Sequence, residues 1–177
     1  IFCGVCPHGF IGKFITKFGL KKKLPKSMAN PFIGVFLLFF GWWFTYYLYP
    51  LHEYKGTHDI GFMMNCSYGN ANRLSPADSV RSALIQTADN LCGRFNPEIG
   101  CIRSWNFGKW NFPVIIDNMM NLDLLFYATR LTGDDKYKEL ALTHARTTMK
   151  NHFRDDYSSY HVVSYNNDGT VEKKCTH

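Results

Sequence analysis

The chain has 177 residues, of which 20 are lysine or arginine and 14 are acidic, so its formal net charge is +6. The excess charge lies in residues 1–50, which hold six lysines and no acidic residue, whereas residues 51–177 hold 14 basic and 14 acidic residues. Because the larger segment is neutral, the composition argues against a nucleic-acid-binding surface, and no nucleic-acid partner is expected. We therefore treat residues 1–50 and 51–177 as separate domains.

The N-terminal segment opens on a basic stretch with two cysteines, Cys3 and Cys6, in a C-x-x-C-P pattern. This pattern resembles the iron–sulfur segment of membrane-bound ferredoxin-like proteins, in which such a motif precedes a transmembrane helix. The resemblance implies a 4Fe-4S cluster at residues 1–6. A four-iron cluster needs four thiolates, and only these two cysteines lie close together, so the alternative is a remnant that binds nothing.

An uncharged run of eighteen residues, FIGVFLLFFGWWFTYYLY, follows between Pro31 and Pro50. Its length predicts a transmembrane helix over residues 32–49, and the aromatic residues at its C-terminal end are typical of a membrane interface. All six lysines precede the run, so the positive-inside rule places residues 51–177 on the periplasmic or extracellular side of the membrane. A buried core helix is the alternative, and the protein is then soluble.

Two helices are predicted next. Thr57 is a suitable N-cap for a first helix with Asp59 in its first turn, and Ser75 followed by Pro76 is a strong start signal for a second. The second helix keeps its apolar residues at helical spacing until Asn96-Pro97.

A second pair of helices and a hairpin complete the pattern. A helix with Asp117 in its first turn is expected to end at Gly133, and Asp134 is expected to cap a fourth helix. That fourth helix is predicted to carry one apolar stripe (Tyr137, Leu140, Ala141, Ala145, Met149). His144 and His152 belong to this outer helix and are expected to be inert. Alternation around Asn-Asp-Gly then predicts a short β-hairpin near the C-terminus. Helical hairpins stacked in this order indicate an all-α fold built in two layers.

The stretch most suggestive of chemistry is RSWNFGKWNFPVIIDNMMNLDLL, residues 103–125. It places Asp117 among apolar residues near the positive end of a helix, where carboxyl groups are often tuned for catalysis. Aromatic rings in the preceding loop offer flat apolar surfaces to the C–H faces of a sugar. We therefore expect a carbohydrate-binding cleft here.

Several strings in residues 54–177 resemble the unsaturated glucuronyl hydrolases of glycoside hydrolase family 88. In order they are HDIGFMMNCSYGNANRL, RFNPEIGCIRSW, FPVIIDNMMNLDLLFYATRLTGD and HARTTMKNHFRDDYSSYHVV. The resemblance implies part of an (α/α)6 toroid, a six-hairpin glycosidase fold. It also implies removal of the terminal 4,5-unsaturated uronic acid from glycosaminoglycan lyase products, by hydration of the vinyl ether double bond. Neither a metal nor an organic cofactor is expected.

The resemblance also assigns roles to individual residues. Asp117 matches one of two essential aspartates. The other is expected in a motif of the type THQGYSDDS, of which Thr176 and His177 are the opening pair, so the chain is predicted to be a truncated fragment without its second catalytic aspartate.

Further substrate-binding candidates surround Asp117. Trp105 is expected to stack on the sugar, Asp59 to line the same mouth, and His161 to contact the substrate carboxylate. A final candidate pair, Asn118 and Asn121, could orient the Asp117 carboxylate. Each has a structural alternative, such as a packing tryptophan, an ordinary helix N-terminal acid or a structural histidine.

Three other readings remain open at this point. The unsaturated rhamnogalacturonyl hydrolases share the toroid and the chemistry. Residues 1–50 alone would suggest a membrane iron–sulfur electron-transfer protein. The abrupt change in composition near Leu51 also allows a join that is not biological.

Overall fold

The structure, a computed structural model, describes residues 36, 39–40, 43 and 49–176. The chain divides into two compact units, Ile1–Phe44 and Thr45–His177, and the helices and strands given below belong to the second. Cys3, Cys6 and most of the predicted membrane segment 32–49 lie outside the described residues. Among the residues that are described, no helix is long and apolar enough to cross a membrane. The iron–sulfur and membrane hypotheses thus stay predictions.

The first helical hairpin follows a short 3-10 helix, η2 (Tyr49–Glu53). Its first arm consists of α3 (Ile60–Met64), a π-helical turn η3 (Asn65–Gly69) and α4 (Asn70–Leu74), which succeed one another without a break. Its second arm is α5 (Asp78–Cys92). The Thr57 hydroxyl accepts a hydrogen bond from the backbone N–H of Asp59, at 3.2 Å, but α3 begins at Ile60 with Asp59 at its N-cap, so the predicted cap at Thr57 is wrong by two residues.

The predicted helix start at Ser75 and Pro76 is wrong. Helix α5 begins at Asp78, and Ala77 precedes it in an extended conformation. Ser75 instead ends α4 with an extended φ of −146°, because the residue before a proline is pushed out of the helical region.

The second helical hairpin begins with a 3-10 turn, η4 (Ile116–Asn121), which leads directly into α6 (Leu122–Thr132). Helix α6 ends at Gly133, whose φ of 76° is the left-handed conformation that favours glycine at this position. Helix α7 (Lys136–His152) follows, and the Asp134 carboxylate accepts a hydrogen bond from the Lys136 N–H. The predicted order of the two helix pairs is therefore confirmed.

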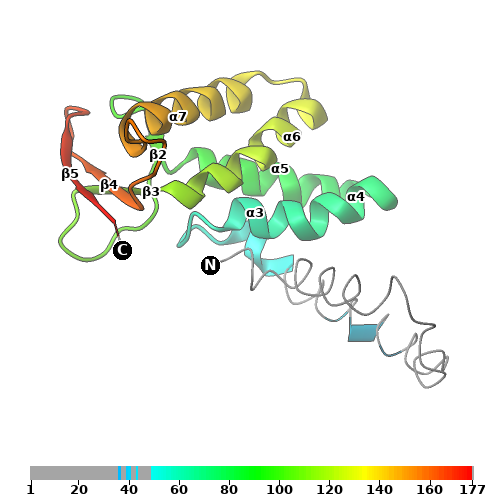
Figure 1. Cartoon of the computed structure of the whole chain (residues 1–177). Coiled ribbons are helices and arrows are strands. Elements are labelled where there is room, and N and C mark those ends of the chain that lie inside the picture. Colours follow the sequence, from blue (N-terminus) through cyan, green and yellow to red (C-terminus); the bar gives the residue numbers. More distant parts are fainter. Residues whose placement is uncertain (1–35, 37–38, 41–42, 44–48, 177) are drawn as a thin grey trace, which may run out of the picture. The chain divides into compact units, whose positions relative to one another are not determined.

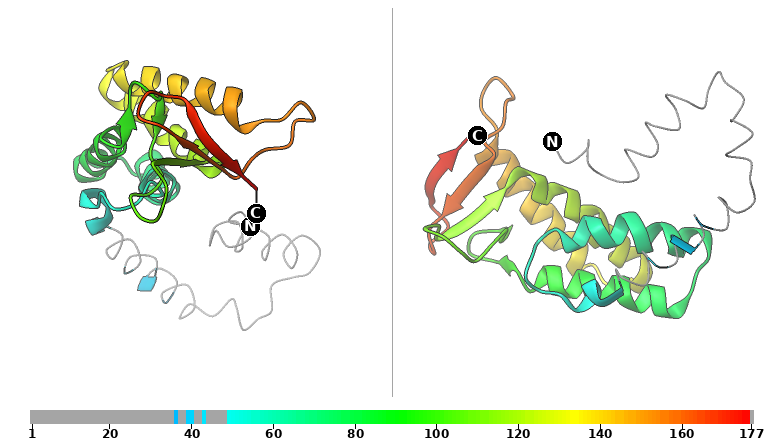
Figure 2. Two further views of the ribbon diagram at one scale, coloured as in Figure 1. Left: turned by 90° about the vertical axis from the view of Figure 1, so that its left-hand side faces the viewer. Right: turned by 90° about the horizontal axis from the view of Figure 1, so that it is seen from below.

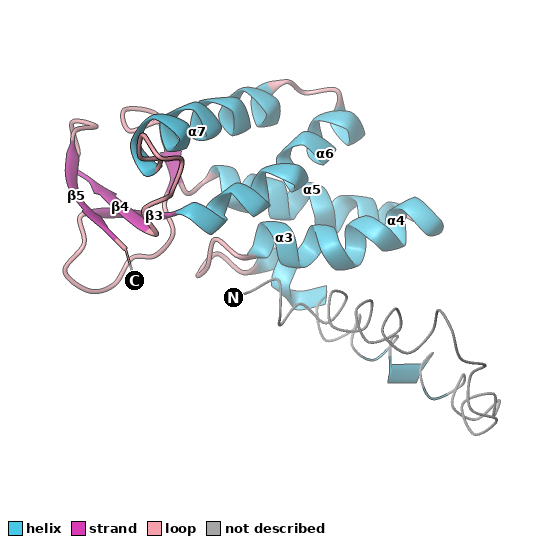
Figure 3. Ribbon diagram, viewed as in Figure 1, coloured by secondary structure: helices cyan, strands magenta, loops and turns pink. Residues whose placement is uncertain are grey.

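The prediction of an all-α fold is wrong in one respect, because two small antiparallel sheets accompany the helices (Figure 3). The first joins β1 (Phe95–Asn96) to β2 (Cys101–Ile102). The second has the order β3 (Phe112–Ile115), β4 (Val162–Tyr165) and β5 (Val171–Cys175). Strands β4 and β5 are the predicted hairpin. Strand β3, which was expected as loop and helix start, pairs with β4 because its four residues, all buried, face an equally buried partner strand.

The buried face of α7 also differs from the prediction. His144 and His152 are fully buried, whereas Met149, which was placed in the apolar stripe, is 68% exposed. The face turned inward holds Tyr137, Ala141, His144, Thr148 and His152. Because several residues of this buried face are polar, the hydrophobic pattern of the sequence did not reveal it.

The helices pack side by side with the three-stranded sheet at one end of the helical layer (Figures 1 and 2). One apolar core joins the inner faces of α3, α5, α6 and α7, and a second lies between the sheet and the β1–β2 loop. The polar residues described next lie where β3 passes into η4, close to the start of α3.

Candidate active site

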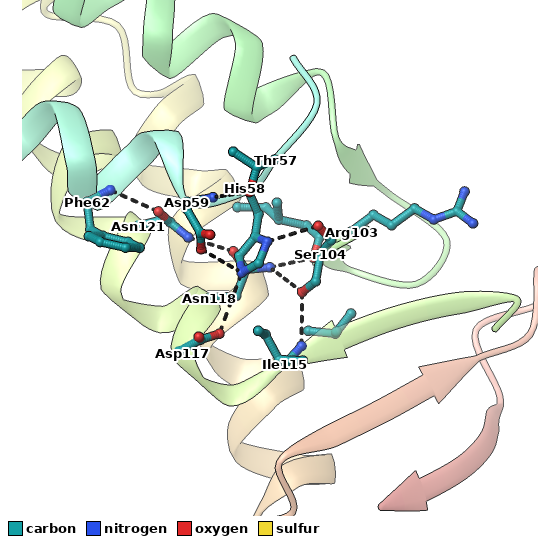
Figure 4. Close-up of polar contacts among 12 residues, drawn as sticks. Thr57, His58, Asp59, Phe62, Arg103, Ser104, Ile115, Asp117, Asn118 and Asn121 are labelled. Atoms are coloured by element: carbon teal, nitrogen blue, oxygen red, sulfur yellow. Dashed lines mark hydrogen bonds and ion pairs between the residues drawn. The ribbon is translucent and has the colours of Figure 1, made fainter. Parts of the chain in front are cut away.

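Three segments that are distant in the sequence meet at the start of α3 (Figure 4). The first is the loop containing His58 and Asp59, the second is the segment after β2 that contains Ser104, and the third is the β3–η4 junction with Asp117. Each segment is held in place by backbone contacts as well as by side chains.

His58 is the centre of this arrangement. It is 6% exposed, and its Nδ1 lies 2.9 Å from the backbone carbonyl oxygen of Ser104. Since a carbonyl can only accept a hydrogen bond, the Nδ1 atom must carry a proton. Its Nε2 atom lies 3.1 Å from Asp59 Oδ1 and 3.5 Å from Asp117 Oδ1.

This geometry determines the charge that the site needs. A neutral imidazole with its proton on Nδ1 turns the Nε2 lone pair toward two carboxylates. The lone pair and the two negatively charged carboxylates repel one another unless a proton or another cation lies between them. Within the described part of the chain, neither His58 Nε2 nor Asp117 Oδ1 makes an aligned hydrogen bond, although both atoms are buried. His58, Asp59 and Asp117, which we call the carboxylate cluster, are therefore suited to hold one mobile proton.

The two carboxylates of this cluster are only partly covered. The side chain of Asp59 is 32% exposed and that of Asp117 is 23% exposed. Both groups can meet a ligand from solvent, while His58 lies behind them. Asp59, which was expected to line the same mouth as Asp117, thus lies at the same histidine, and the second catalytic aspartate expected in the motif after Thr176 and His177 stays a prediction.

Ser104 connects the cluster to the surrounding backbone. Its carbonyl oxygen accepts hydrogen bonds from both His58 Nδ1 and Arg94 Nη2, the latter at 3.0 Å. Its hydroxyl oxygen accepts one from the Ile115 N–H at 3.0 Å. The guanidinium of Arg94 also donates to the carbonyl oxygens of Lys55 and Arg103. One buried serine and one arginine thus fix the position of His58 relative to β3.

Asn118 and Asn121, for which orientation of the Asp117 carboxylate stays a prediction, are completely buried. The Asn118 amide donates to the carbonyl oxygen of Ile102 at 2.7 Å and accepts a hydrogen bond from Asn121. The Asn121 side-chain oxygen accepts the N–H of Phe62 at 2.9 Å. Their contacts tie η4 to α3 and β2, so these residues set the position of the backbone that carries Asp117.

Buried histidines of α7 support the site from behind. The Ile102 N–H donates to His144 Nδ1 at 3.0 Å, so the backbone N–H and the carbonyl oxygen of Ile102 both have buried side-chain partners. Burial lowers the pKa of His144 to about 3, and burial likewise lowers the pKa of His152, which lies 3.1 Å from the carbonyl oxygen of Val114. Both imidazoles are neutral at pH 7 and act as structural hydrogen-bonding groups.

The remaining candidates lie near the cluster in the chain. Trp105, directly after Ser104, is partly buried and packs against Phe107 and Trp110, each with its ring centroid 5.9 Å away. The backbone oxygen of His161 accepts the Ile116 N–H at 3.0 Å, which places this residue next to the first turn of η4. The roles of Trp105 in stacking and of His161 in substrate binding stay predictions.

The sequence reasoning missed His58, Ser104 and Arg94. A histidine directly before Asp59 at a helix start was the available signal, but two of its partners, Ser104 and Asp117, lie 46 residues or more away along the chain. No local pattern reveals such contacts.

No family model matches the chain. An unsaturated glucuronyl hydrolase of Formosa agariphila is 47% identical over 129 residues, which cover 71% of this chain and 32% of that protein. An unsaturated chondroitin disaccharide hydrolase of Streptococcus pyogenes is 34% identical over 110 residues, covering 61% of this chain and 28% of that protein. The chain thus spans about a third of the length of the curated relatives it matches.

A crystal structure of an unsaturated glucuronyl hydrolase specific for heparin superposes with a TM-score of 0.73 and 51% identity. The match covers 76% of this chain and 36% of that one. It supports the expected relation to the toroids of this family, and these comparisons give no support to the ferredoxin-like resemblance of residues 1–6. Over about 71% of its length the chain is therefore a homologue of part of the unsaturated glucuronyl hydrolases, the relationship that the sequence strings indicated.

Proposed function

We propose that this chain supplies part of the active site of an enzyme that removes the terminal 4,5-unsaturated uronic acid from glycosaminoglycan lyase products. The observation that carries this proposal is the buried His58 held between two partly exposed carboxylates, Asp59 and Asp117. Relatives that act on chondroitin disaccharides and on heparin support the substrate class.

The proposed reaction is a hydration of the vinyl ether double bond. The π electrons of the C4–C5 bond take a proton at C4 from the Asp117 carboxyl group, which leaves an oxocarbenium-like centre at C5. A water molecule then bonds to C5 and returns a proton to the Asp117 carboxylate, so the acid is regenerated. The resulting hemiketal collapses, the ring opens and the remaining saccharide is released.

The carboxylate cluster suits this chemistry because its ring nitrogen and two carboxylates lie close enough to share one proton. If that proton resides on Asp117, the group is a general acid. The side chains of Asp59 and His58 then stabilise the positive charge that develops at C5 by electrostatic attraction. Because Ser104 fixes the Nδ1–H of His58, the imidazole presents the same Nε2 atom to both carboxylates throughout the cycle.

Trp105 completes the proposed site. Its ring is partly exposed and braced by Phe107 and Trp110, so it offers a rigid flat surface to the saccharide. The proposed hydration requires neither a metal nor an organic cofactor.

The test uses a protein of the relatives' length that contains residues 51–177. Unsaturated chondroitin and heparin disaccharides are incubated with it, and the ultraviolet absorbance of the C4–C5 double bond is followed. We expect the absorbance to fall with at least one substrate, and Asp117→Asn to slow that fall by at least about 100-fold, because the amide cannot donate or accept the proton.

Asp155→Asn is the matched control, since it makes the same chemical change at an exposed turn. It should leave the rate unchanged. Equal rates in the Asp117→Asn variant and the unsubstituted protein would overturn the assignment of Asp117. A wild-type protein inactive on both disaccharides would overturn the proposed substrate class.

A further inference from the structure

The carboxylate cluster has the composition and spacing of a metal-binding site. One imidazole nitrogen and one oxygen from each of two carboxylates all lie within 4.8 Å of one another. His58 Nε2 lies 3.1 Å from Asp59 Oδ1 and 3.5 Å from Asp117 Oδ1.

These separations match the edges of a tetrahedral coordination sphere. Ligand bonds to Zn²⁺ of about 2.0–2.2 Å place neighbouring ligand atoms about 3.4 Å apart in a tetrahedron. His58 therefore already lies at ligand spacing from both carboxylates, and the third edge, between the two carboxylate oxygens, is no longer than 4.8 Å.

The surroundings of His58 support the same interpretation. Histidine ligands usually donate their second ring N–H to a carbonyl or carboxylate, which fixes the tautomer that binds metal. His58 Nδ1 does so with the Ser104 carbonyl oxygen at 2.9 Å, and Nε2 is buried without an aligned hydrogen bond and directed at the carboxylates. The partial exposure of both carboxylates leaves a route for an ion and a fourth position for water.

We propose that His58 Nε2, Asp59 and Asp117 bind a borderline divalent cation, Zn²⁺ or Co²⁺, as three protein ligands. Two carboxylates and one imidazole suit these ions better than Ca²⁺ or Mg²⁺, which prefer oxygen ligands alone. The ion takes the place of the mobile proton and occupies both carboxylates, so it inhibits the proposed hydration rather than assisting it. The site therefore makes the protein sensitive to zinc.

The test is a Co²⁺ titration of the 177-residue chain followed by visible absorption. Cys3 and Cys6 are first replaced by serine, because a C-x-x-C pair binds Co²⁺ on its own. We expect one Co²⁺ per chain, with d–d bands and no thiolate charge-transfer band in the near ultraviolet. His58→Ala and Asp59→Asn should each weaken binding at least about tenfold, whereas Asp155→Asn should not.

Asp59→Asn keeps the shape of a partly exposed side chain, so it tests the site even if the His58→Ala variant fails to fold. Absence of bound Co²⁺, a thiolate spectrum, or equal binding in the Asp59→Asn variant would overturn the proposal. Because bound Co²⁺ is read directly, the result does not depend on hydrolase activity. In an active protein of the relatives' length, added Zn²⁺ should inhibit in competition with the disaccharide, and undiminished turnover under saturating Zn²⁺ would refute the inhibitory role.

Discussion

Replacement of Gly61 by alanine should disrupt the polar contacts that position Asp117. A Cβ atom at Gly61 would lie 2.5 Å from the Asn121 side-chain oxygen and 2.7 Å from its Cβ, which is closer than real contacts allow. Asn121 is completely buried and bonded to both Phe62 and Asn118. It cannot move into solvent, so the added methyl group must push α3 away from η4.

The size of the effect follows from three contributions. Overpacking of a filled core costs about 1–3 kcal/mol. Loss or distortion of the two Asn121 hydrogen bonds costs about 1 kcal/mol each. Alanine in a helix recovers about 0.5–1 kcal/mol relative to glycine. We therefore expect Gly61→Ala to lower the free energy of unfolding by about 2–4 kcal/mol.

The assay is urea unfolding of the 177-residue chain, followed by far-ultraviolet circular dichroism. Gly93→Ala is the matched control, because Gly93 has a helical φ of −63° and a Cβ there would meet its nearest atom at 3.4 Å. We expect a clear fall in the urea midpoint for Gly61→Ala and little change for Gly93→Ala. Equal midpoints for the two variants would refute the reasoning about the contact between α3 and η4.

Two further predictions concern groups behind the site. His144 has a pKa of about 3 in the folded chain and about 6.5 in the unfolded chain, so between these values the unfolded chain binds the additional proton. The contribution of neutral His144 to the free energy of unfolding is therefore complete above about pH 6.5. It falls toward pH 3, by up to about 1.4 kcal/mol per pH unit. The urea midpoint should therefore drop between pH 7 and pH 5, and by less in His144→Asn, which keeps an acceptor for the Ile102 N–H; identical pH dependence in both proteins would contradict this. Arg94→Lys should lower the melting temperature measured by calorimetry, because a lysine ammonium cannot donate hydrogen bonds to the Lys55, Arg103 and Ser104 carbonyl oxygens at the same time. An unchanged melting temperature would show that these hydrogen bonds are dispensable for stability.

Much of the fold could be predicted because its signals are local. Helical spacing of apolar residues identified the helix pairs, Gly133 marked the end of α6, and the Asn-Asp-Gly turn marked the β4–β5 hairpin. Strand β3 could not be recognised, since four residues between an aromatic loop and a helix carry no period of their own. Its conformation depends on pairing with β4, which lies far away in the sequence.

The site was predictable only in part for the same reason. Asp117 was recognised by its position in a helix turn among apolar residues. Asn118 and Asn121 look like flanking polar residues in the sequence, yet their hydrogen bonds reach into the core. His144 and His152 were expected to be inert residues of an outer helix, because the burial of a polar side chain cannot be recognised in a hydrophobic pattern.

The carboxylate partner of Asp117 is located differently by the sequence motif and by the structure. It was sought beyond Thr176 and His177, whereas the structure brings Asp59 to the same histidine as Asp117. The central claim is consequently that Asp59, His58 and Asp117 act together.

The most direct test of that claim is the rate of double-bond hydration by Asp59→Asn in a protein of the relatives' length. Loss of absorbance and release of the remaining saccharide are measured together, and circular dichroism verifies that the variant is folded. We expect a folded variant in which both rates fall in parallel by at least about 100-fold. A folded Asp59→Asn variant that hydrates the unsaturated disaccharide at the rate of the unsubstituted protein would contradict the claim.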